Sequence, residues 1–533
     1  MRQSHLIAYN TLLIWASRVL QIIPQLILVP YLIHHIGDSG YGTYTLIWSL
    51  MLAIDRVEQS LQQGVIKYSA AFAAQKRIEE VNKVISSSFV YSVLLAIVVC
   101  IVILSAGRFY PYAPEQMNSL LIVISITILL VIPLTPYKGI VLSQQRHYAD
   151  ALSETASKYM NLIMVFVWYH FIGPSILALV VISCVMLILS RFIQVPIAYH
   201  LVTGLHNRPA NFDRQMLKTV AAFGGMAVLT ALCLIANNAG IRWLMGILIS
   251  PSFVAHLAII MMPVILLTQI VTASTITVMP ATSAYEAKGN LQLLEELLIR
   301  SIRYSAILAL TGLLAGVILI RQVLIIWIGN EYAFLAPYMI TLFISSSFML
   351  STSTAHHMLK GLGKLRTTLF IYLTALVVLP VGLILIMLEM QYNPYLAVTS
   401  GLASGYLACG CFHIGFAAKV MKVRLQEILV RGYVQPITAA VISAIVTGLI
   451  YFGRTENSIA RVFMSMTAVL LFLLIIYFFV TTQEERRQFK DFVCVLKERI
   501  TFLFQRPFTS RHNKTDDKSI FPEGYAKSGK EHS

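Results

Sequence analysis

Charged residues are scarce in this chain of 533 residues. They make up 12% of it, whereas hydrophobic residues make up 57%. In soluble globular proteins about 25% of the residues are charged. The scarcity therefore excludes a soluble globular domain, and it predicts an all-α polytopic integral membrane protein.

Acidic residues are the scarcer kind of charge. The chain has 24 of them against 40 lysines and arginines, which gives a formal net charge of +16. A basic protein can bind nucleic acid, but here the basic residues are dispersed through short loops between hydrophobic runs. That distribution is the positive-inside pattern of membrane proteins, so we expect no nucleic-acid partner.

Cysteine is also rare, and the loops between the hydrophobic runs are short. The six cysteines lie mostly within hydrophobic runs and lack the spacing of a zinc site or a C-x-x-C motif. We therefore expect reduced cysteines, no bound metal and no cofactor. No internal loop exceeds roughly 20 residues, and no G-x-x-x-x-G-K-[ST] nucleotide motif occurs, so we expect no catalytic residues and no enzyme activity.

Hydrophobic runs long enough to cross a bilayer recur about 14 times. The expected helices are Leu6–Ile33, Tyr41–Lys67, Val84–Leu104, Ser119–Leu142, Leu152–Phe171, Ser175–Leu201, Thr219–Trp243, Phe253–Met279, Ser301–Val323, Leu335–Met358, Thr367–Leu388, Tyr395–Ala418, Tyr433–Phe452 and Val462–Thr481. Loops after even-numbered helices hold most of the basic residues, Lys158 among them. The opposite loops hold little beyond Arg108, Arg242 and Arg454. The positive-inside rule therefore predicts that both termini are cytoplasmic.

Two segments indicate an internal duplication. The stretch that starts at Val65 aligns without gaps on the stretch that starts at Val278. We therefore expect a first lobe at residues 1–217 with helices one to six and a second lobe at residues 218–432 with helices seven to twelve, followed by helices thirteen and fourteen at residues 433–482. Residues 483–533 are expected to form a cytoplasmic basic amphipathic helix, from Glu484 to Gln505, and a disordered tail.

Polar residues form a stripe along each of the first two expected helices. They are Arg18, Gln21 and Gln25 in the first helix, and Asp55, Arg56, Glu58 and Gln59 in the second. On a helical wheel, those of the second helix fall within roughly 160° of one another. Ionised side chains at bilayer depth are costly against lipid, so they normally face a bundle interior or a water-filled cavity.

We therefore predict a hydrated chamber between these two helices. Arg18 and Arg56 would bind an anionic cargo, with hydrogen bonds from the three glutamines, and Asp55 or Glu58 would bind a coupling ion. Simpler interpretations remain open. Arg18 and Asp55 lie at the same depth and can form a structural ion pair, Arg56 can pair with Glu58, and Glu58 can be hydrated near the inner surface.

Further candidates for cargo binding lie in later helices. They are Arg191, Asn237, Asn238 and Gln269, with Lys138 in a helix that Pro133 and Pro136 interrupt. The alternatives are that the two basic side chains reach toward the cytoplasmic surface and that the asparagines form hydrogen bonds between helices. Pro24 and Pro30 predict hinges or simple kinks in the first helix.

Several segments resemble the polysaccharide-exporter branch of the MATE-like superfamily, which contains the Wzx-type O-antigen flippases. They are N-T-L-L-I-W-A-S-R from Asn10, V-P-Y-L-I-H-H-I-G-D-S-G-Y-G-T-Y from Val29, M-P-A-T-S-A-Y-E-A-K-G-N from Met279 and L-I-I-W-I-G-N-E-Y-A from Leu324. The resemblance extends to about Thr481 and rests on order, spacing and helix count rather than on one motif.

This resemblance implies a fold, a cargo and a location. It implies two lobes around a V-shaped cavity, alternating access, and flipping of an undecaprenyl-diphosphate-linked oligosaccharide across the bacterial inner membrane. It also implies a proton or sodium gradient as the energy source. The implied partners are the lipid-linked oligosaccharide, membrane lipids, a polysaccharide polymerase and a chain-length regulator.

Other functions remain open at this stage. A MATE-like exporter of soluble small molecules would share the architecture, and a peptidoglycan-precursor flippase would share the basic cavity. A membrane glycosyltransferase or O-antigen polymerase fits poorly, because the chain lacks a sizeable soluble loop for the chemistry.

Overall fold

The computed structural model describes residues 2–107, 115–144, 146–275, 278, 282, 285–286, 291–451, 458–483 and 485–487. Every regular element among them is a helix, which confirms the all-α prediction. Residues 1–474 form one compact unit and residues 475–533 another. The amphipathic helix and tail predicted after Glu484 lie almost wholly outside the described residues, and so do nine residues between 279 and 290, in the first half of the second copy of the proposed duplication.

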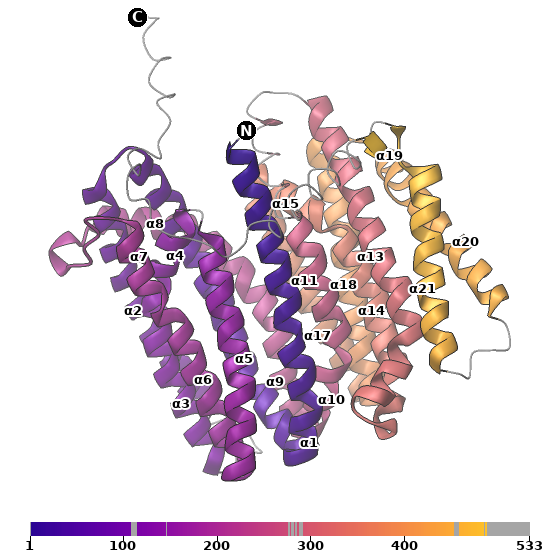
Figure 1. Cartoon of the computed structure of the whole chain (residues 1–533), viewed down its shortest axis with the longest axis horizontal. Coiled ribbons are helices and arrows are strands. Elements are labelled where there is room, and N and C mark those ends of the chain that lie inside the picture. Colours follow the sequence, from indigo (N-terminus) through magenta and orange to yellow (C-terminus); the bar gives the residue numbers. More distant parts are fainter. Residues whose placement is uncertain are drawn as a thin grey trace, which may run out of the picture. The chain divides into compact units, whose positions relative to one another are not determined.

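The helices up to residue 201 pack mainly on one another, and we call them the first bundle (Figure 1). They are α1 (Arg2–Ala74), α2 (Ile78–Gly107), α3 (Glu115–Val131), the 3₁₀ turn Ile132–Leu134, α4 (Thr135–Ser143), α5 (His147–Phe171), α6 (Ile176–Phe192) and α7 (Gln194–Leu201). The 3₁₀ turn contains Pro133 and precedes Pro136, so the predicted interruption of this helix is confirmed.

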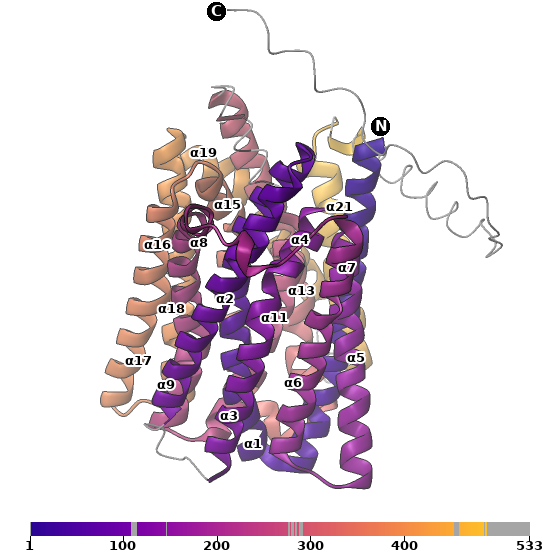
Figure 2. The ribbon, with the colours of Figure 1, turned by 90° about the vertical axis from the view of Figure 1, so that its left-hand side faces the viewer.

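The helices from α8 onward form what we call the second bundle, which lies beside the first in Figure 1 and largely behind it in Figure 2. They are α8 (Arg214–Ile235), the π-turn Ala236–Gly240, α9 (Ile241–Leu248), α10 (Pro251–Ile260), α11 (Met262–Thr275), α13 (Leu291–Trp327), the 3₁₀ turn Asn330–Leu335, α14 (Ala336–Ser351), α15 (Ser353–Gly361), α16 (Leu365–Tyr372), the π-turn Leu373–Val378, α17 (Leu379–Glu389), α18 (Pro394–Met421), α19 (Leu425–Leu429), the π-turn Val430–Val434, α20 (Gln435–Ile450) and α21 (Ser458–Ile475). The other unit contains the π-turn Ile476–Val480. The exact lobe boundaries predicted from the sequence remain a prediction, because residues 1–474 behave as one unit.

Polar side chains begin several of these helices. Ser175, Ser250 and Asn393 each accept a hydrogen bond from the first turn of α6, α10 and α18. Asp213 does the same for α8 through the N–H groups of Met216 and Gln215, and these bonds hold the pKa of its carboxyl below its usual range. Such caps satisfy backbone donors that have no partner within the helix.

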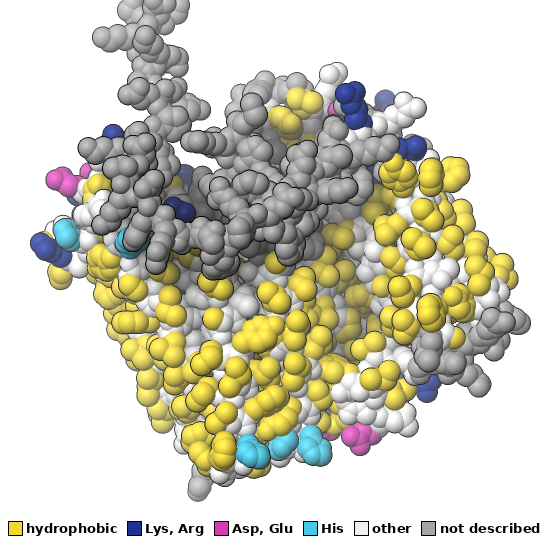
Figure 3. Space-filling model, in the orientation of Figure 1, with side chains coloured by type: hydrophobic (Ala, Val, Ile, Leu, Met, Phe, Trp, Pro, Cys, Tyr) yellow, Lys and Arg dark blue, Asp and Glu magenta, His cyan; other side chains and the backbone are white. Residues whose placement is uncertain are grey.

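Eleven described helices are long and apolar enough to cross a membrane, or twelve if α10 and α11, bent by 40°, form one span. The 58-residue stretch Ala16–Ala73 counts once among them, although α1 is divided at Gly37, and α5 is not among them. With α1 divided and α5 included, the twelve become the expected fourteen. Figure 3 shows the corresponding surface, a broad expanse of hydrophobic side chains with Lys and Arg mainly at the end where α1 begins. The chain is a multi-pass membrane protein.

Two glycines shape α1 at the end of the bundles opposite to its start, which we call the far end. Gly37 has a φ of 66°, a left-handed conformation that divides α1 into two antiparallel spans. At Gly42 a Cβ would lie 1.8 Å from the carbonyl oxygen of Pro251 in α10. Only glycine permits this approach, so the backbones of the two bundles touch there.

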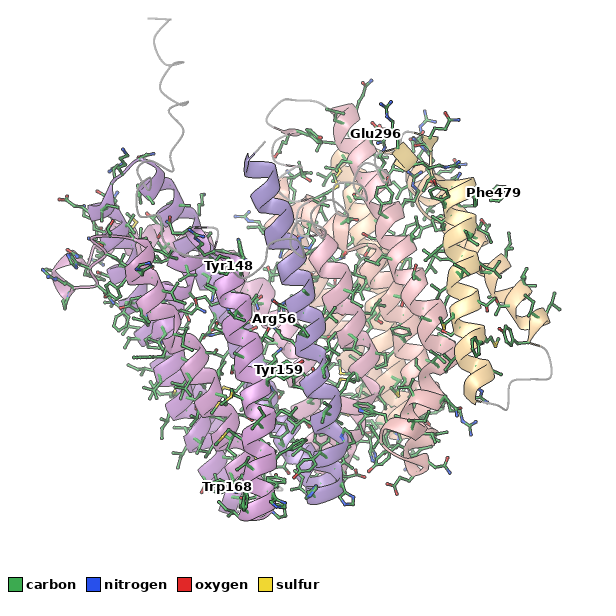
Figure 4. The ribbon with its side chains drawn as sticks, in the orientation of Figure 1. Arg56, Tyr148, Tyr159, Trp168, Glu296 and Phe479 are labelled. Atoms are coloured by element: carbon green, nitrogen blue, oxygen red, sulfur yellow. The ribbon has the colours of Figure 1, made fainter. Side chains whose placement is uncertain are left out.

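Three prolines free backbone carbonyls in the membrane, and a neighbouring helix supplies a donor to each. A helical proline has no N–H for the carbonyl four residues earlier. For Pro24 that carbonyl is Leu20, which accepts from the Tyr159 hydroxyl of α5 at 3.1 Å (Figure 4). For Pro30 it is Leu26, which accepts from Nε1 of Trp327 at 2.6 Å.

The third case lies within the second bundle. Pro380 frees the carbonyl of Leu376, and Nδ2 of Asn237 donates to it at 2.8 Å. In hydrocarbon such carbonyls would otherwise have no hydrogen-bond partner, so these three side chains stabilise the kinked helices.

We predict that Trp327→Phe destabilises the protein by about 1–3 kcal/mol, because the Leu26 carbonyl loses its donor. Pro30→Ala restores an N–H for the same carbonyl, so the double variant is expected to recover part of the loss. Thermal unfolding in detergent measures both effects. Trp168→Phe is the matched control, since Nε1 of Trp168 has no hydrogen-bond partner among the described residues. A loss in Trp327→Phe that Pro30→Ala leaves unchanged would contradict the assignment.

Candidate functional site

Arg191 of α6 is the centre of a buried charge cluster in the first bundle. Its Nη2 atom lies 3.3 Å from Asp55 and 3.4 Å from Glu58, both on α1, and its Nη1 atom lies 3.1 Å from Glu154 of α5. Its side chain is 5% exposed. A guanidinium offers a planar set of donors, which suits it to bind carboxylates from several helices at once.

Lys138 of α4 extends this cluster. Its Nζ atom lies 2.9 Å from Asp150 and 2.8 Å from Glu154. Lys138 and Arg191 are both buried, so the interpretation that they reach toward the membrane surface is wrong. The physical reason is that α5 supplies carboxylates at the same depth, and paired charges can remain in the interior.

Arg18 lies at the edge of the cluster. Its side chain is 48% exposed, and its Nη1 atom is 3.8 Å from Glu154 and 3.4 Å from the side-chain oxygen of Gln21. Gln21 is buried and also accepts from Lys158 at 2.9 Å. The predicted pair between Arg18 and Asp55 is wrong, because Glu154 and Arg191 provide their partners instead.

The polar face of the second half of α1 is divided between protein and solvent. Glu58 and Gln62 are buried, and Oε1 of Glu58 has no hydrogen-bond partner among the described residues. Asp55 is 41% exposed and accepts from Gln59 at 2.8 Å. Arg56 and Gln59 are exposed, and Figure 4 shows Arg56 in the region between α5 and the first half of α1. Only part of the polar face of this helix, which was predicted to line a hydrated chamber, is therefore exposed to solvent.

The second bundle faces this region with a lysine and a group of histidines. Lys360 of α15 lies close enough to Arg56 for their charges to interact. His356, on the same helix, is buried, stacks on Tyr372 and contacts the ring of His413. The rings of His356 and His357 lie edge to face, and among the described residues no group of three or more potential ligands could hold a metal ion.

The remaining predicted residues are spread over three helices. Gln25 donates to the sulfur of Met262 at 3.5 Å, which links the two bundles. Asn237 is buried and donates a hydrogen bond to the Leu376 carbonyl, which agrees with the alternative interpretation that the asparagines form hydrogen bonds between helices. Asn238 is exposed. Gln269 is half-buried and its Oε1 atom has no partner in the described part of the chain.

At the far end a second polar cluster joins the bundles, and we call it the far-end cluster. Asp38, just after Gly37, lies 3.0 Å from Nε2 of His256 in α10 and accepts from the Tyr332 hydroxyl at 2.7 Å. Nδ1 of His256 lies 2.5 Å from the hydroxyl of Tyr395 in α18. Together with the contact at Gly42, these bonds close the two bundles onto each other.

The charged residues of α5 were not among the site residues predicted from the sequence. Asp150, Glu154 and Lys158 recur every four residues, so they lie on one face of a helix. This spacing could have identified them. Lys158 lies within α5 and not in a loop, and Arg242, expected in a loop on the opposite side, lies in α9.

The class that this architecture defines is a polytopic helical membrane protein with the fold of MATE transporters. No family model matches the chain, and no curated protein sequence matches it significantly.

Solved structures do match. One is the inward-facing conformation of a multidrug resistance MATE family transporter of the MOP superfamily, with a TM-score of 0.64 and 14% identity over 78% of this chain and 99% of that one. The outward-facing conformation of such a transporter matches with a TM-score of 0.59, 14% identity and coverages of 78% and 96%. A MOP superfamily transporter from Pyrococcus furiosus, whose binding pocket is described as reversed in polarity, matches with a TM-score of 0.55, 16% identity and coverages of 79% and 95%. The predicted MATE-like fold is confirmed.

We predict that Arg191→Gln destabilises the protein by about 3–5 kcal/mol, because it leaves buried carboxylates without their cation. Adding Glu58→Gln is expected to recover part of this loss. Arg18→Gln serves as the control and is expected to cost less than about 1 kcal/mol, since that side chain is 48% exposed. Thermal unfolding in detergent at neutral pH measures the loss of stability in each variant. An equal loss in Arg191→Gln and Arg18→Gln would contradict the central role of Arg191.

Proposed function

We propose that the protein flips an undecaprenyl-diphosphate-linked oligosaccharide across the bacterial inner membrane by alternating access. The observation that carries this proposal is the approach of two cations from opposite bundles, Arg56 of α1 and Lys360 of α15. Like charges repel. An anion between them would remove this repulsion and bind both bundles.

The balance of charge around this region supports an anionic cargo. Among the described residues, four carboxylates stand against six cations. The carboxylates are Asp55, Glu58, Asp150 and Glu154, and the cations are Arg18, Arg56, Lys138, Lys158, Arg191 and Lys360. Lys138 and Arg191 pair with Glu58, Asp150 and Glu154. The excess of cations over carboxylates favours a ligand such as a diphosphate.

The same region offers groups for sugar hydroxyls. Gln59 and Gln63 lie about one and two turns after Arg56 on α1, and both are exposed although α1 is a long helix of a membrane protein. Amide side chains donate and accept hydrogen bonds, so they match hydroxyl groups well. A lipid-linked sugar needs cations for its phosphates and such groups for its head, and both are present here.

Contacts at the far end support a conformation that is closed there. The far-end cluster and the Gly42 contact join the bundles at that end, whereas Arg18 and Asp55 are 48% and 41% exposed. We take the far end as periplasmic and the opposite end, where α1 begins, as cytoplasmic, in accord with the positive-inside rule. The cargo would then enter from the cytoplasmic leaflet.

Asp55 and Glu58 are the proposed coupling groups. Both lie on α1 and share Nη2 of Arg191, while Oε1 of Glu58 is buried without a partner in the described residues. A proton on either carboxylate would weaken its bond to Arg191, so ion binding and the packing of α1 against α6 would be linked.

We expect Arg18→Gln and Arg56→Gln each to slow transport about ten-fold, since each removes a charged hydrogen bond to phosphate. The measurement is translocation of a lipid-linked oligosaccharide in proteoliposomes, checked by rescue of cells that lack their own repeat-unit flippase. Arg214→Gln, an exposed arginine at the start of α8, is the matched control. Normal rates in both cavity variants would reject this cargo site.

The same assay separates the rival functions. A MATE-like exporter of soluble compounds would leave the lipid-linked sugar unflipped despite good expression, while it moved small organic cations. A peptidoglycan-precursor flippase would accept a diphosphate lipid with a peptide-bearing head in preference to an oligosaccharide. Transport of the oligosaccharide lipid alone fits the proposal.

We expect Glu58→Gln to abolish the dependence of transport on an imposed proton gradient while some ungated flipping remains. The physical reason is that the amide of glutamine cannot bind and release a proton as the carboxylate of Glu58 would. Initial rates with and without a proton gradient, and with sodium replaced by potassium, give the readout. If the gradient drives the variant as strongly as the unmodified protein, coupling lies elsewhere.

A further inference from the structure

His256 of α10 lies in the far-end cluster between hydrogen-bonding groups of two other helices. Its Nε2 atom is 3.0 Å from Oδ2 of Asp38, which belongs to the first bundle, and its Nδ1 atom is 2.5 Å from the hydroxyl of Tyr395 in the second bundle. Oδ1 of Asp38 accepts from the Tyr332 hydroxyl at 2.7 Å. These bonds form a chain that crosses from one bundle to the other.

The partners of His256 fix the positions of its hydrogen atoms. An ionised carboxylate only accepts hydrogen bonds, so Nε2 carries a hydrogen atom and donates it to Asp38. Nδ1 faces the Tyr395 hydroxyl, which can donate or accept. Neutral His256 therefore accepts from Tyr395, whereas the imidazolium form donates to it once the hydroxyl hydrogen has turned away. Both protonation states fit the same arrangement of heavy atoms, so the ring can bind a proton without a change in packing.

A proton on His256 strengthens its contact with Asp38. In the imidazolium form both partners are charged, which adds a Coulomb attraction to the hydrogen bond. The contact exists only while the bundles are closed at the far end, because Asp38 and His256 belong to different bundles. Proton binding and closure are therefore linked. The added stabilisation of the closed state is present at acid pH and is lost as the pH rises through the titration of the imidazole.

The proton can reach His256 from the solution at the far end. The side chain of His256 is 14% exposed and that of Asp38 is 30% exposed. Asp38 directly follows Gly37, where α1 turns between its two spans. Asp55, the nearer of the two proposed coupling groups, lies 17 residues further along α1, or roughly 25 Å away. A proton at His256 is therefore not the proton proposed for Asp55 or Glu58.

His256 is the group of the far-end cluster whose charge changes near neutral pH. The other titratable groups that face it are Asp38, Tyr332 and Tyr395, and Glu331 is exposed beside Tyr332. The elements packed on α10 also carry Tyr41, Tyr44, Tyr338 and, in the first turn of α9, Arg242. Carboxyl groups, phenols and guanidinium groups ordinarily titrate outside the range from about pH 5 to about pH 8, in which an imidazole changes its charge.

Two further histidines lie near the far end but make their contacts within the first bundle. His34 and His35 of α1 are exposed, and Nδ1 of His35 is 2.8 Å from the carbonyl oxygen of Tyr31. The ring of His35 contacts that of Tyr169 in α5. Figure 3 shows histidine side chains along this end of the surface. Parting of the bundles leaves these contacts intact, so His34 provides a matched control.

We propose that His256 is a proton-binding site for the solution at the far end, and that a bound proton holds the two bundles closed there. With the far end taken as periplasmic, an acid periplasm would favour the conformation that is closed toward it, and release of the proton would favour opening. The inference goes beyond the proposed function, because it concerns which face of the protein is open and applies to any cargo.

The test measures opening at the far end without any cargo. Spin labels are attached through Ile172→Cys at the end of α5 and Met390→Cys at the end of α17, two exposed positions on different bundles. Cys411, which is exposed, and Cys494 are replaced by alanine, whereas the other four cysteines are buried. Distance distributions from double electron–electron resonance, recorded in nanodiscs at about pH 5.5 and about pH 8, give the ratio of closed to open protein.

The ratio of closed to open protein is expected to fall about five-fold from acid to alkaline pH, since a partly exposed ion pair contributes about that much. His256→Gln keeps a donor for Asp38 but cannot bind the proton, so its ratio should not depend on pH. Asp38→Asn should lose the dependence as well and be more open at both pH values. Tyr332→Phe removes a bond that does not titrate here, so it should lower the ratio equally at both pH values and keep the pH dependence.

The control variant and the contrary outcomes separate this site from other histidines. His34→Gln should keep the full pH dependence. An unchanged pH dependence in His256→Gln would place the proton elsewhere and overturn the proposal, as would a wild-type protein that opens in acid or does not respond to pH. Should His256→Gln fail to fold, Asp38→Asn and Tyr332→Phe still distinguish a titrating contact from a non-titrating one.

The readout is independent of the proposed function. The spin-label distances need no substrate, so a failure to move lipid-linked oligosaccharide in proteoliposomes would reject the cargo and leave the result at His256 unaffected. Conversely, a far end that does not respond to pH would overturn the proton site while the cargo assignment still stands on its own transport assay.

Discussion

The absence of hydrogen-bond partners in hydrocarbon is the constraint on which this structure depends. Every polar group within the membrane must find a partner in the protein or reach water. The carbonyls freed by Pro24, Pro30 and Pro380 find a tyrosine, a tryptophan and an asparagine on neighbouring helices. Arg191 finds three carboxylates. These matches decide which helices lie side by side more precisely than the packing of similar apolar surfaces does.

The same constraint explains why exceptions to it are informative. Asp55 is 41% exposed and Arg56 is exposed, although both lie on a membrane-spanning part of α1, so this region is open to water or a polar ligand. Arg242 is 6% exposed, and among the described residues no carboxylate forms an ion pair with it. The far-end cluster joins the two bundles at the far end.

The sequence predicts the helices well because hydrophobic length and proline position act locally. The break around Pro133 and the two spans on either side of Gly37 follow from such local rules. Partners within the site could not be predicted in the same way. A helical wheel gives the direction in which Arg18 and Asp55 point. It does not show that Glu154 of α5 is the partner of Arg18, or that Arg191 of α6 is the partner of Asp55. The interpretation that Arg18 pairs with Asp55, which rested on their equal depth in the membrane, is wrong for this reason. Arg242 was expected in a loop, because the sequence near a helix end does not show whether a residue lies in the loop or is buried in the helix.

The bond between Trp327 and the Leu26 carbonyl joins residues 301 positions apart in the chain. Ribosomes add about 5–20 residues per second, so the first span waits roughly 15–60 s in the membrane before its donor has been made. During that interval the carbonyl must be served by water, lipid headgroups or the insertion machinery. The opening helix of the protein therefore reaches its final shape late in biosynthesis, and chain order and assembly order differ.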